Sequence, residues 1–279
     1  MMTTPPTVQA ELDGEFARSH HSSNLINVPP HVLGSCQFND EPVALHIAGV
    51  REFNRGAFEM FAEAETPAEA ADAFENYMHA AFGIDPEQSD RSGAHRRFRS
   101  SYLRLLRGWA YDANSPEGAV LKGWVESRFG LLPTFHKQPL DAASSGVWTT
   151  YVTEKMSTRF HDNSIYAQLD LLYEFGQWQQ RRFGADETHV TLYRGTNDFA
   201  EHRIIEKLDR RTMIVLLNNV VSFTHDRDIA GCFGDYVLQA RVPHPKILFA
   251  NALLARHPLK AEGEYLVIGG EYRVSISYG

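Results

Sequence analysis

Two glutamates, Glu262 and Glu264, stand at the entry to an apolar run at residues 265–268. Side-chain direction in an extended chain repeats every second residue, so both carboxylates lean toward the same side of the predicted strand. Gly263 between them leaves room for a ligand to approach the backbone. Carboxylates in this position can stabilise positive charge on a bound molecule or take a proton from it.

Two further groups with binding potential precede the glutamates, each at the edge of a short β-run. Arg194 ends the run 191–194 and is followed by Gly195. Its guanidinium can hold a phosphate through two hydrogen bonds, and the glycine lets a ligand come near. Ser222 and Thr224 flank Phe223, so the two hydroxyls share one strand face and the ring takes the other.

Each of these residues also fits an ordinary structural role when it is considered alone. Arg194 could pair with Asp198 or Glu201 at the surface, and a strand edge commonly carries Ser and Thr. The order arginine, serine, Glu-x-Glu, with every member at a β-run boundary, is therefore more informative than any single residue.

Helical patterns fill the chain from about 55 to 185 and would support these residues. Thr66, Pro67 and Glu69 read as an N-cap, a first helical position and a capping-box residue, and Gly83 can end that helix. A second helix is expected from Ser115 to Gly130. The longest runs from near Asp162 to Gly184, with an apolar stripe that includes Ile165, Leu169, Leu172 and Phe175.

The hydrophobic period changes to short β-runs from about 188 to 279. Runs are expected at 189–194, 212–223, 235–242, 246–250, 264–269 and 271–278, the last two separated by a Gly269-Gly270 turn. Helices followed by mostly antiparallel strands predict an α+β fold. Residues 1–22 read as a flexible arm, and residues 23–279 as a single domain.

Composition narrows the function classes. A formal net charge of −8 and a pI near 5.9 argue against general nucleic-acid binding. Cys36 and Cys232 fit reduced thiols, and neither a membrane span nor a secretory signal is visible, so we expect a cytoplasmic protein. No G-x-G-x-x-G, Walker A, H-E-x-x-H or C-x-x-C motif is present, which disfavours hydride transfer on a Rossmann domain and a metal site.

The arginine, serine and Glu-x-Glu order resembles the arginine-directed mono-ADP-ribosyltransferases. A closer resemblance, to the dinitrogenase reductase ADP-ribosyltransferases, covers nearly the whole chain from about residue 20. It rests on the stretches 21–25, 38–40, 48–52, 129–131, 193–199 and 262–270. This family transfers ADP-ribose from NAD to an arginine of the nitrogenase iron protein, dinitrogenase reductase, and so switches off nitrogen fixation reversibly. The resemblance also implies control by a PII-type nitrogen-signalling protein.

The resemblance implies a role for each candidate residue. Glu264 would stabilise the ribose cation, Glu262 would hold the incoming arginine, and Ser222 would orient Glu264 or the ribose. Arg194 and Gly195 would bind the NAD phosphates. Toxins of the superfamily often carry Ser-Thr-Ser where this chain has Ser222-Phe223-Thr224. The carry-over is therefore firmer for Ser222 than for Thr224, and Phe223 gains a stacking role.

Other functions stay open at this point. An NAD glycohydrolase, a transferase with another protein target, or a regulatory module that binds NAD without turnover could share parts of this pattern. A basic cluster is either a solvated face or a docking surface for an acidic partner. It comprises Arg91, His95, Arg96, Arg97, Arg99, Arg104 and Arg107.

Overall fold

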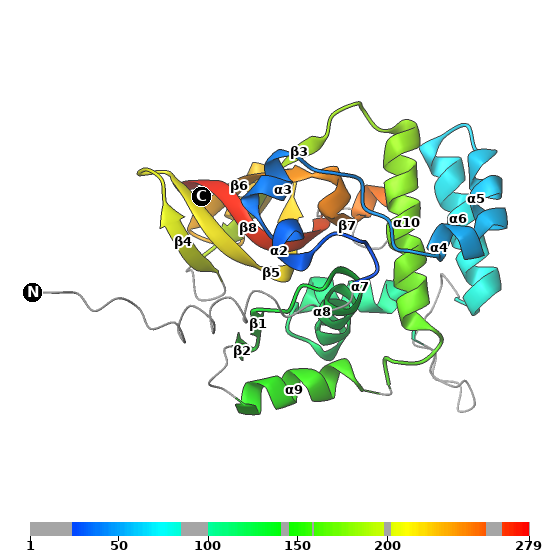
Figure 1. Cartoon of the computed structure of the whole chain (residues 1–279), viewed down its shortest axis with the longest axis horizontal. Helices are drawn as coiled ribbons and strands as arrows, with labels where there is room; N and C mark the ends of the chain where they lie inside the picture. The colour runs from blue at the N-terminus through cyan, green and yellow to red at the C-terminus, as the bar shows by residue number, and fades with distance from the viewer. Residues whose placement is uncertain are drawn as a thin grey trace, which may run out of the picture.

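The chain folds into a helical part followed by an antiparallel sheet (Figure 1). A computed structural model describes residues 24–84, 100–140, 145–157, 159–197, 202–254 and 264–278. Every strand pairing in these ranges is antiparallel. The predicted α+β class is therefore confirmed.

Helices occupy the described chain up to residue 183. They are α2 (Pro30–Leu33), α3 (Cys36–Asp40), α4 (Val50–Phe53), α5 (Arg55–Ala62), α6 (Pro67–Phe82), α7 (Tyr102–Tyr111), α8 (Pro116–Phe129), α9 (Ser145–Lys155) and α10 (Ile165–Phe183). A short hairpin of β1 (Phe135–His136) and β2 (Gln138–Pro139) lies between α8 and α9.

Capping residues set the ends of two helices as predicted. The Thr66 side chain accepts a hydrogen bond from the Glu69 amide, and α6 ends at Gly83 with φ of 63°. Ser115 caps α8 in the same way, and that helix ends at Gly130 with φ of 75°. The longest helix, expected from near Asp162, begins three residues later than that position. Asp162 instead accepts a hydrogen bond from the Ser100 amide, and α10 begins at Ile165.

The sheet has the strand order β4-β5-β3-β6-β8-β7, and β5 also pairs with β8. Its strands are β3 (His189–Thr196), β4 (Arg203–Lys207), β5 (Thr212–Thr224), β6 (Tyr236–Pro243), β7 (Ile247–Ala250) and β8 (Glu264–Tyr278). The additional pairing closes β5, β3, β6 and β8 into a ring. A short helix, α11 (Arg227–Gly231), connects β5 to β6.

The predicted turn at Gly269-Gly270 is wrong, because β8 continues through it as one strand. The pairing with β5 shifts between Leu217 and Val220, which marks a β-bulge opposite the glycines. A Cβ added to Gly269 would lie 1.6 Å from the Asn218 carbonyl oxygen, and one added to Gly270 would lie 2.6 Å from that of Gly34. The glycines therefore permit close backbone packing and a bend within the strand.

Strands β5 and β8 contribute to two separate cores. One set of their side chains, including Val221, Phe223 and Val267, packs with residues of β3 and β6. The neighbouring residues Val220 and Leu266 point to the other face and join the core of the helices. The two strands thus connect the ring of strands to the helical part.

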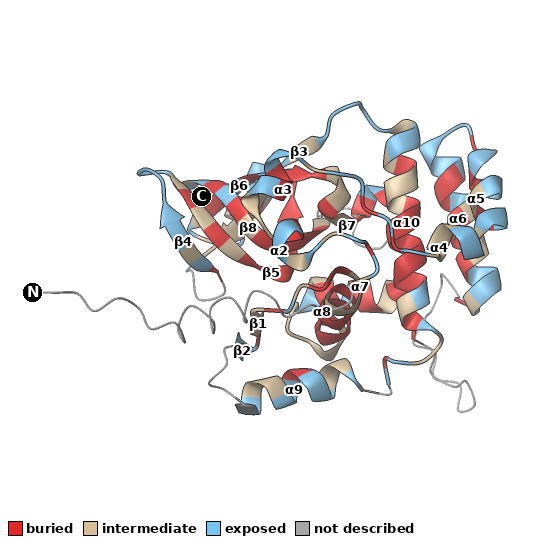
Figure 2. Cartoon of the chain, in the orientation of Figure 1, coloured by how far each residue is buried: buried red, intermediate tan, exposed pale blue. Residues whose placement is uncertain are grey.

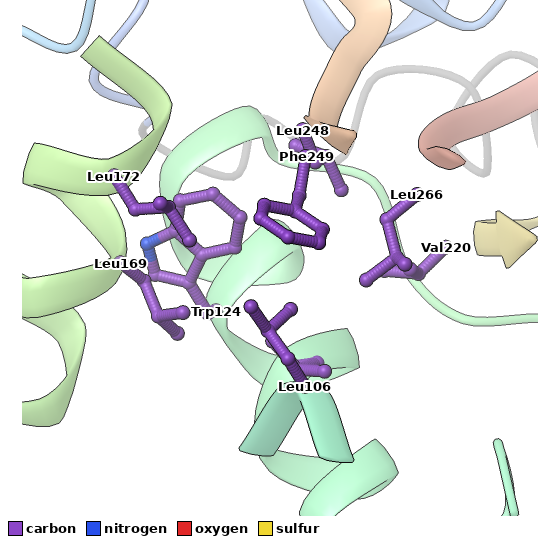
Figure 3. Close-up of a pocket in the computed structure, with 9 residues that line it drawn as sticks. Leu106, Trp124, Leu169, Leu172, Val220, Leu248, Phe249 and Leu266 are labelled. Atoms are coloured by element: carbon purple, nitrogen blue, oxygen red, sulfur yellow. The ribbon is translucent and has the colours of Figure 1, made fainter. Parts of the chain in front are cut away.

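The contact between helices and sheet is tightly packed. Val220 and Leu266 of the strands, Leu106 of α7 and Trp124 of α8 are among the residues that line a void of about 10 Å³, about the size of one water molecule. Figure 3 shows Phe249 between the two strand residues and Trp124. Buried residues also run along α10, which stands between α6 and the strands (Figure 2). Among the described residues, no helix combines the length and the apolar character that crossing a bilayer requires.

Candidate active site

Ser222 and Glu264 meet where β5 ends and the described part of β8 begins. Thr224 is the direct partner of Glu264 across the two strands, and Ser222 is the partner of Leu266. Ser222 and Glu264 are therefore diagonal neighbours on one sheet face. The Ser222 Oγ donates a hydrogen bond to Glu264 Oε1 at 2.6 Å, a short bond of the charge-assisted kind. Both residues are partly exposed, so a ligand can reach the carboxylate.

Trp109 completes this contact from the helical part. Its indole Nε1 donates to Ser222 Oγ at 2.7 Å, and its side chain is buried. Nothing in the sequence pointed to this residue as part of the site. Trp109 follows Tyr102, Leu105 and Leu106 on the buried face of α7, a spacing that predicts only a core position.

Arg194 lies against the same part of β5. Its Nη1 donates to the Ser222 carbonyl oxygen at 3.0 Å, and its Nε donates to Nε2 of the buried His202 at 3.1 Å. Arg194 contacts the carbonyl of Ser222 and Glu264 contacts its hydroxyl, so the structure brings these three residues together, while their roles toward NAD stay predictions. The alternative partners, Asp198 and Glu201, lie outside the described residues.

The three other predicted NAD-binding residues make contacts within the protein. A Cβ added to Gly195 would lie 2.0 Å from the Ala230 carbonyl oxygen, so this glycine admits α11 against β3. Thr224 is buried, and its hydroxyl accepts a hydrogen bond from the Asp226 amide. Phe223 is 3% exposed and lies in the core of the strand ring, beside Tyr272. Its burial does not support stacking on a nucleotide.

Several predicted residues lie outside the part of the chain that the structure describes. Glu262 lies outside the described residues, so its position relative to Glu264 stays a prediction. Most of the basic cluster, from Arg91 to Arg99, also lies outside them. Its last two members are on α7, where the Arg104 Nε stands 4.0 Å from a carboxylate oxygen of Glu117 and Arg107 is exposed.

A buried polar network lies behind the Trp109 ring. The Lys122 ammonium is 5.8 Å from the ring centroid and donates to the Asn114 side chain at 3.1 Å and to the Phe135 carbonyl at 3.0 Å. The same ammonium lies 3.4 Å from Nδ1 of His136, whose Nε2 is 2.8 Å from a Glu154 oxygen. Burial lowers the pKa of His136, which favours a neutral ring that donates to Glu154.

The arrangement suits the stabilisation of positive charge on a bound molecule. A carboxylate fixed by a hydroxyl stands at an accessible strand end, with a guanidinium nearby for an anionic group. The described residues contain no group of three or more His, Cys, Asp or Glu side chains that could hold a metal ion.

Comparison with known proteins covers nearly the whole chain. Residues 23–276 match the family model described as dinitrogenase reductase ADP-ribosyltransferase. A relative from Rhodospirillum rubrum, NAD(+)--dinitrogen-reductase ADP-D-ribosyltransferase, is 58% identical in an alignment of 263 residues that covers 92% of this chain and 95% of that protein. No solved structure matches. With the arginine, serine and glutamate assembled at one strand end, the chain belongs to the dinitrogenase reductase ADP-ribosyltransferase family.

Proposed function

We propose that this chain transfers ADP-ribose from NAD to an arginine side chain of dinitrogenase reductase and so reversibly switches off nitrogen fixation. Family membership and the activity in the name of the R. rubrum relative support this reaction. The hydrogen bond between Ser222 Oγ and Glu264 Oε1 carries the assignment of the site, because it holds a carboxylate at an accessible strand end.

NAD serves as a substrate in this reaction. When the bond between nicotinamide and ribose C1′ breaks, its electron pair leaves with nicotinamide and the ribose becomes positively charged, as in oxocarbenium-like transition states. Glu264 stabilises that charge through the ribose 2′-hydroxyl. Arg194 binds the diphosphate, because its guanidinium lies beside Ser222 and can form paired hydrogen bonds with phosphate oxygens.

The acceptor needs a second carboxylate. A guanidinium stays protonated to above about pH 12, so it attacks ribose C1′ poorly without help. Glu262 accepts hydrogen bonds from the incoming arginine, aims its nitrogen at C1′ and takes the proton released as the new bond forms. Such general-base help typically contributes about 10²–10⁴-fold in rate.

The proposal extends to the setting of the enzyme. Residues 23–279 act as one functional unit after the arm at 1–22. A cytoplasmic location fits Cys36 and Cys232, which are both free thiols. Control by a PII-type protein follows from the family resemblance alone.

The decisive test incubates the protein with labelled NAD and purified dinitrogenase reductase, followed by peptide mapping of the label. We expect one modified arginine. Nicotinamide release without labelled protein would instead indicate an NAD glycohydrolase, and binding without release would indicate a regulatory module.

Two substitutions separate the roles of the glutamates. Glu264→Gln should lower both nicotinamide release and protein labelling by about 10²-fold or more, because the amide carries no negative charge. Glu262→Gln should lose protein labelling and keep some nicotinamide release, since attack by water does not require a residue that holds the acceptor guanidinium. Glu206→Gln, at an exposed position on β4, is the matched control and should leave both rates unchanged. An active Glu264→Gln variant would refute the site.

A further inference from the structure

We infer that Trp109 is a positioning residue for the reaction: its indole N–H sets the direction of the Ser222 hydroxyl, which in turn holds Glu264. The inference rests on the proposed function, because it assigns Trp109 a part in stabilising the same transition state. Helix α7, from the N-terminal half, thereby contributes a side chain to the site at the sheet.

The two hydrogen bonds that connect Trp109, Ser222 and Glu264 can run in only one direction. An indole nitrogen can only donate, whereas a serine hydroxyl donates one hydrogen bond and rotates freely to accept others. With Trp109 donating to Ser222 Oγ at 2.7 Å, the hydroxyl proton is left for Glu264 Oε1 at 2.6 Å. Loss of the indole donor would let the hydroxyl turn to other acceptors and release the carboxylate from its fixed orientation.

The Trp109 ring is held firmly enough to set that direction. It is 3% exposed on α7, and Leu106 on the same helix packs against Val220 and Leu266, which lie two residues from Ser222 and Glu264 on their strands. On its other side, the buried Lys122 ammonium lies 5.8 Å from the ring centroid, within the range of a cation–π contact.

A purely structural explanation predicts different behaviour. A buried tryptophan usually finds a partner for its N–H, and Ser222 could serve only that need. Trp124 of α8 provides a matched comparison within the same protein. It is 2% exposed, and its Nε1 donates to Asp170 Oδ1 of α10 at the same 2.7 Å. Its N–H therefore makes an equally short bond that does not involve Ser222 or Glu264.

The test compares Trp109→Phe and Trp124→Phe in steady-state nicotinamide release and in labelling of dinitrogenase reductase. Trp109→Phe should lower kcat about 5- to 30-fold, the loss expected for one hydrogen bond, and leave the KM for NAD within about twofold of the parent. Trp124→Phe should lower thermal stability and leave kcat close to the parental value. In a Ser222→Ala background, Trp109→Phe should have almost no further effect on kcat, because the contact it acts through is already gone.

A second substitution guards against misfolding of the phenylalanine variant. Site-specific replacement of Trp109 by β-(3-benzothienyl)alanine keeps the bicyclic shape and removes only the N–H. It should reproduce the loss in kcat with a parental circular-dichroism spectrum. A parental kcat in the benzothienylalanine variant, or an equal loss of kcat in Trp124→Phe, would overturn the inference. An undiminished effect of Trp109→Phe in the Ser222→Ala background would do so too.

The same assay separates this inference from the proposed function. If the parent releases nicotinamide and Glu264→Gln abolishes that release, normal kcat without the indole N–H refutes the role of Trp109 alone. If the parent shows no turnover of NAD, or if Glu264→Gln remains active, the proposed site and the inference both fail.

Discussion

Replacement of the buried Lys246 by methionine should remove a pH dependence of stability that the fold creates. Lys246 lies in a short 3-10 turn (His244–Lys246) and is fully buried. Its ammonium donates to the Gly269 carbonyl at 3.3 Å and stands 4.8 Å from the Tyr272 ring centroid. Burial lowers the pKa of this amine from 10.5 to about 7, although Cys36 and Glu271 act in the opposite direction.

The two pKa values fix the sign and size of the effect. Between about pH 7 and 10.5 the unfolded chain holds a proton on Lys246 that the folded protein has released. The free energy of unfolding therefore rises with pH across this window, by about 1.4 kcal/mol per pH unit, and the contribution is lost as pH falls toward 7. Over the whole window the difference amounts to roughly 5 kcal/mol.

Denaturant unfolding of the parent and of Lys246→Met at about pH 6, 7.5, 8.5 and 9.5 measures this difference, with coincident circular-dichroism and fluorescence transitions as the check on two-state behaviour. The parent should gain stability relative to the variant only above about pH 7. Burial raises the pKa of the Cys36 thiol, and its charge acts on Lys246, so the comparison is made in a Cys36→Ala background. Lys207→Met, at an exposed position on β4, should run parallel to the parent. If the free energy of unfolding of Lys246→Met also changes with pH in parallel with the parent, the reasoning is refuted.

Two other substitutions test the binding site and the packing beneath it. Arg194→Lys keeps the charge and loses the planar fork, so NAD affinity measured by calorimetry should fall about tenfold or more; unchanged affinity in a folded variant would leave Arg194 a purely structural role beside Ser222 and His202. Leu266→Ala should lower the free energy of unfolding by about 2–5 kcal/mol, because it enlarges the void between sheet and helices. Leu132→Ala, at a 55% exposed position, should lower it little, and equal losses in denaturant unfolding would contradict the burial of Leu266.

Local signals predicted much of the fold because they act over a few residues. Thr66 and Ser115 cap helices through the amide three positions later, so the residue types alone fix where α6 and α8 begin. Alternation of apolar residues likewise located β3, β5, β6 and β7 to within two residues at each end. The helix expected from near Asp162 begins at Ile165, because the Asp162 carboxylate accepts a hydrogen bond from the Ser100 amide, a partner far away in the sequence.

Features that depend on distant partners were not predictable. Gly269 and Gly270 read as a turn, yet they exist to admit the backbone of Asn218 and of Gly34, and nothing near them in sequence says so. Strand β4 was missed because it is a mostly exposed edge strand, paired only with β5 among the described strands, and carries no regular alternation.

The candidate site divides in the same way. Arg194 and Ser222 lie two residues before the ends of β3 and β5, and Glu264 is the first residue of β8. Antiparallel pairing of those strands brings the three residues together, so their order in the sequence was informative. Trp109 reaches the site from 113 residues upstream of Ser222, on a helix face that looks entirely structural. Its role depends on where the indole nitrogen points, which only the packing of α7 against β5 and β8 decides.

The site and the junction between sheet and helices lie on the same face of strands β5 and β8. Val220, Ser222 and Thr224 alternate along β5 on the face that Glu264 and Leu266 share on β8, so each reactive side chain is two residues from one that packs against the helices. A shift of α7 that loosened Leu106 against Leu266 would also move the Trp109 donor away from Ser222. Orientation of the carboxylate is thereby coupled to the integrity of the helical part, even though the residues proposed to contact NAD all come from the strands.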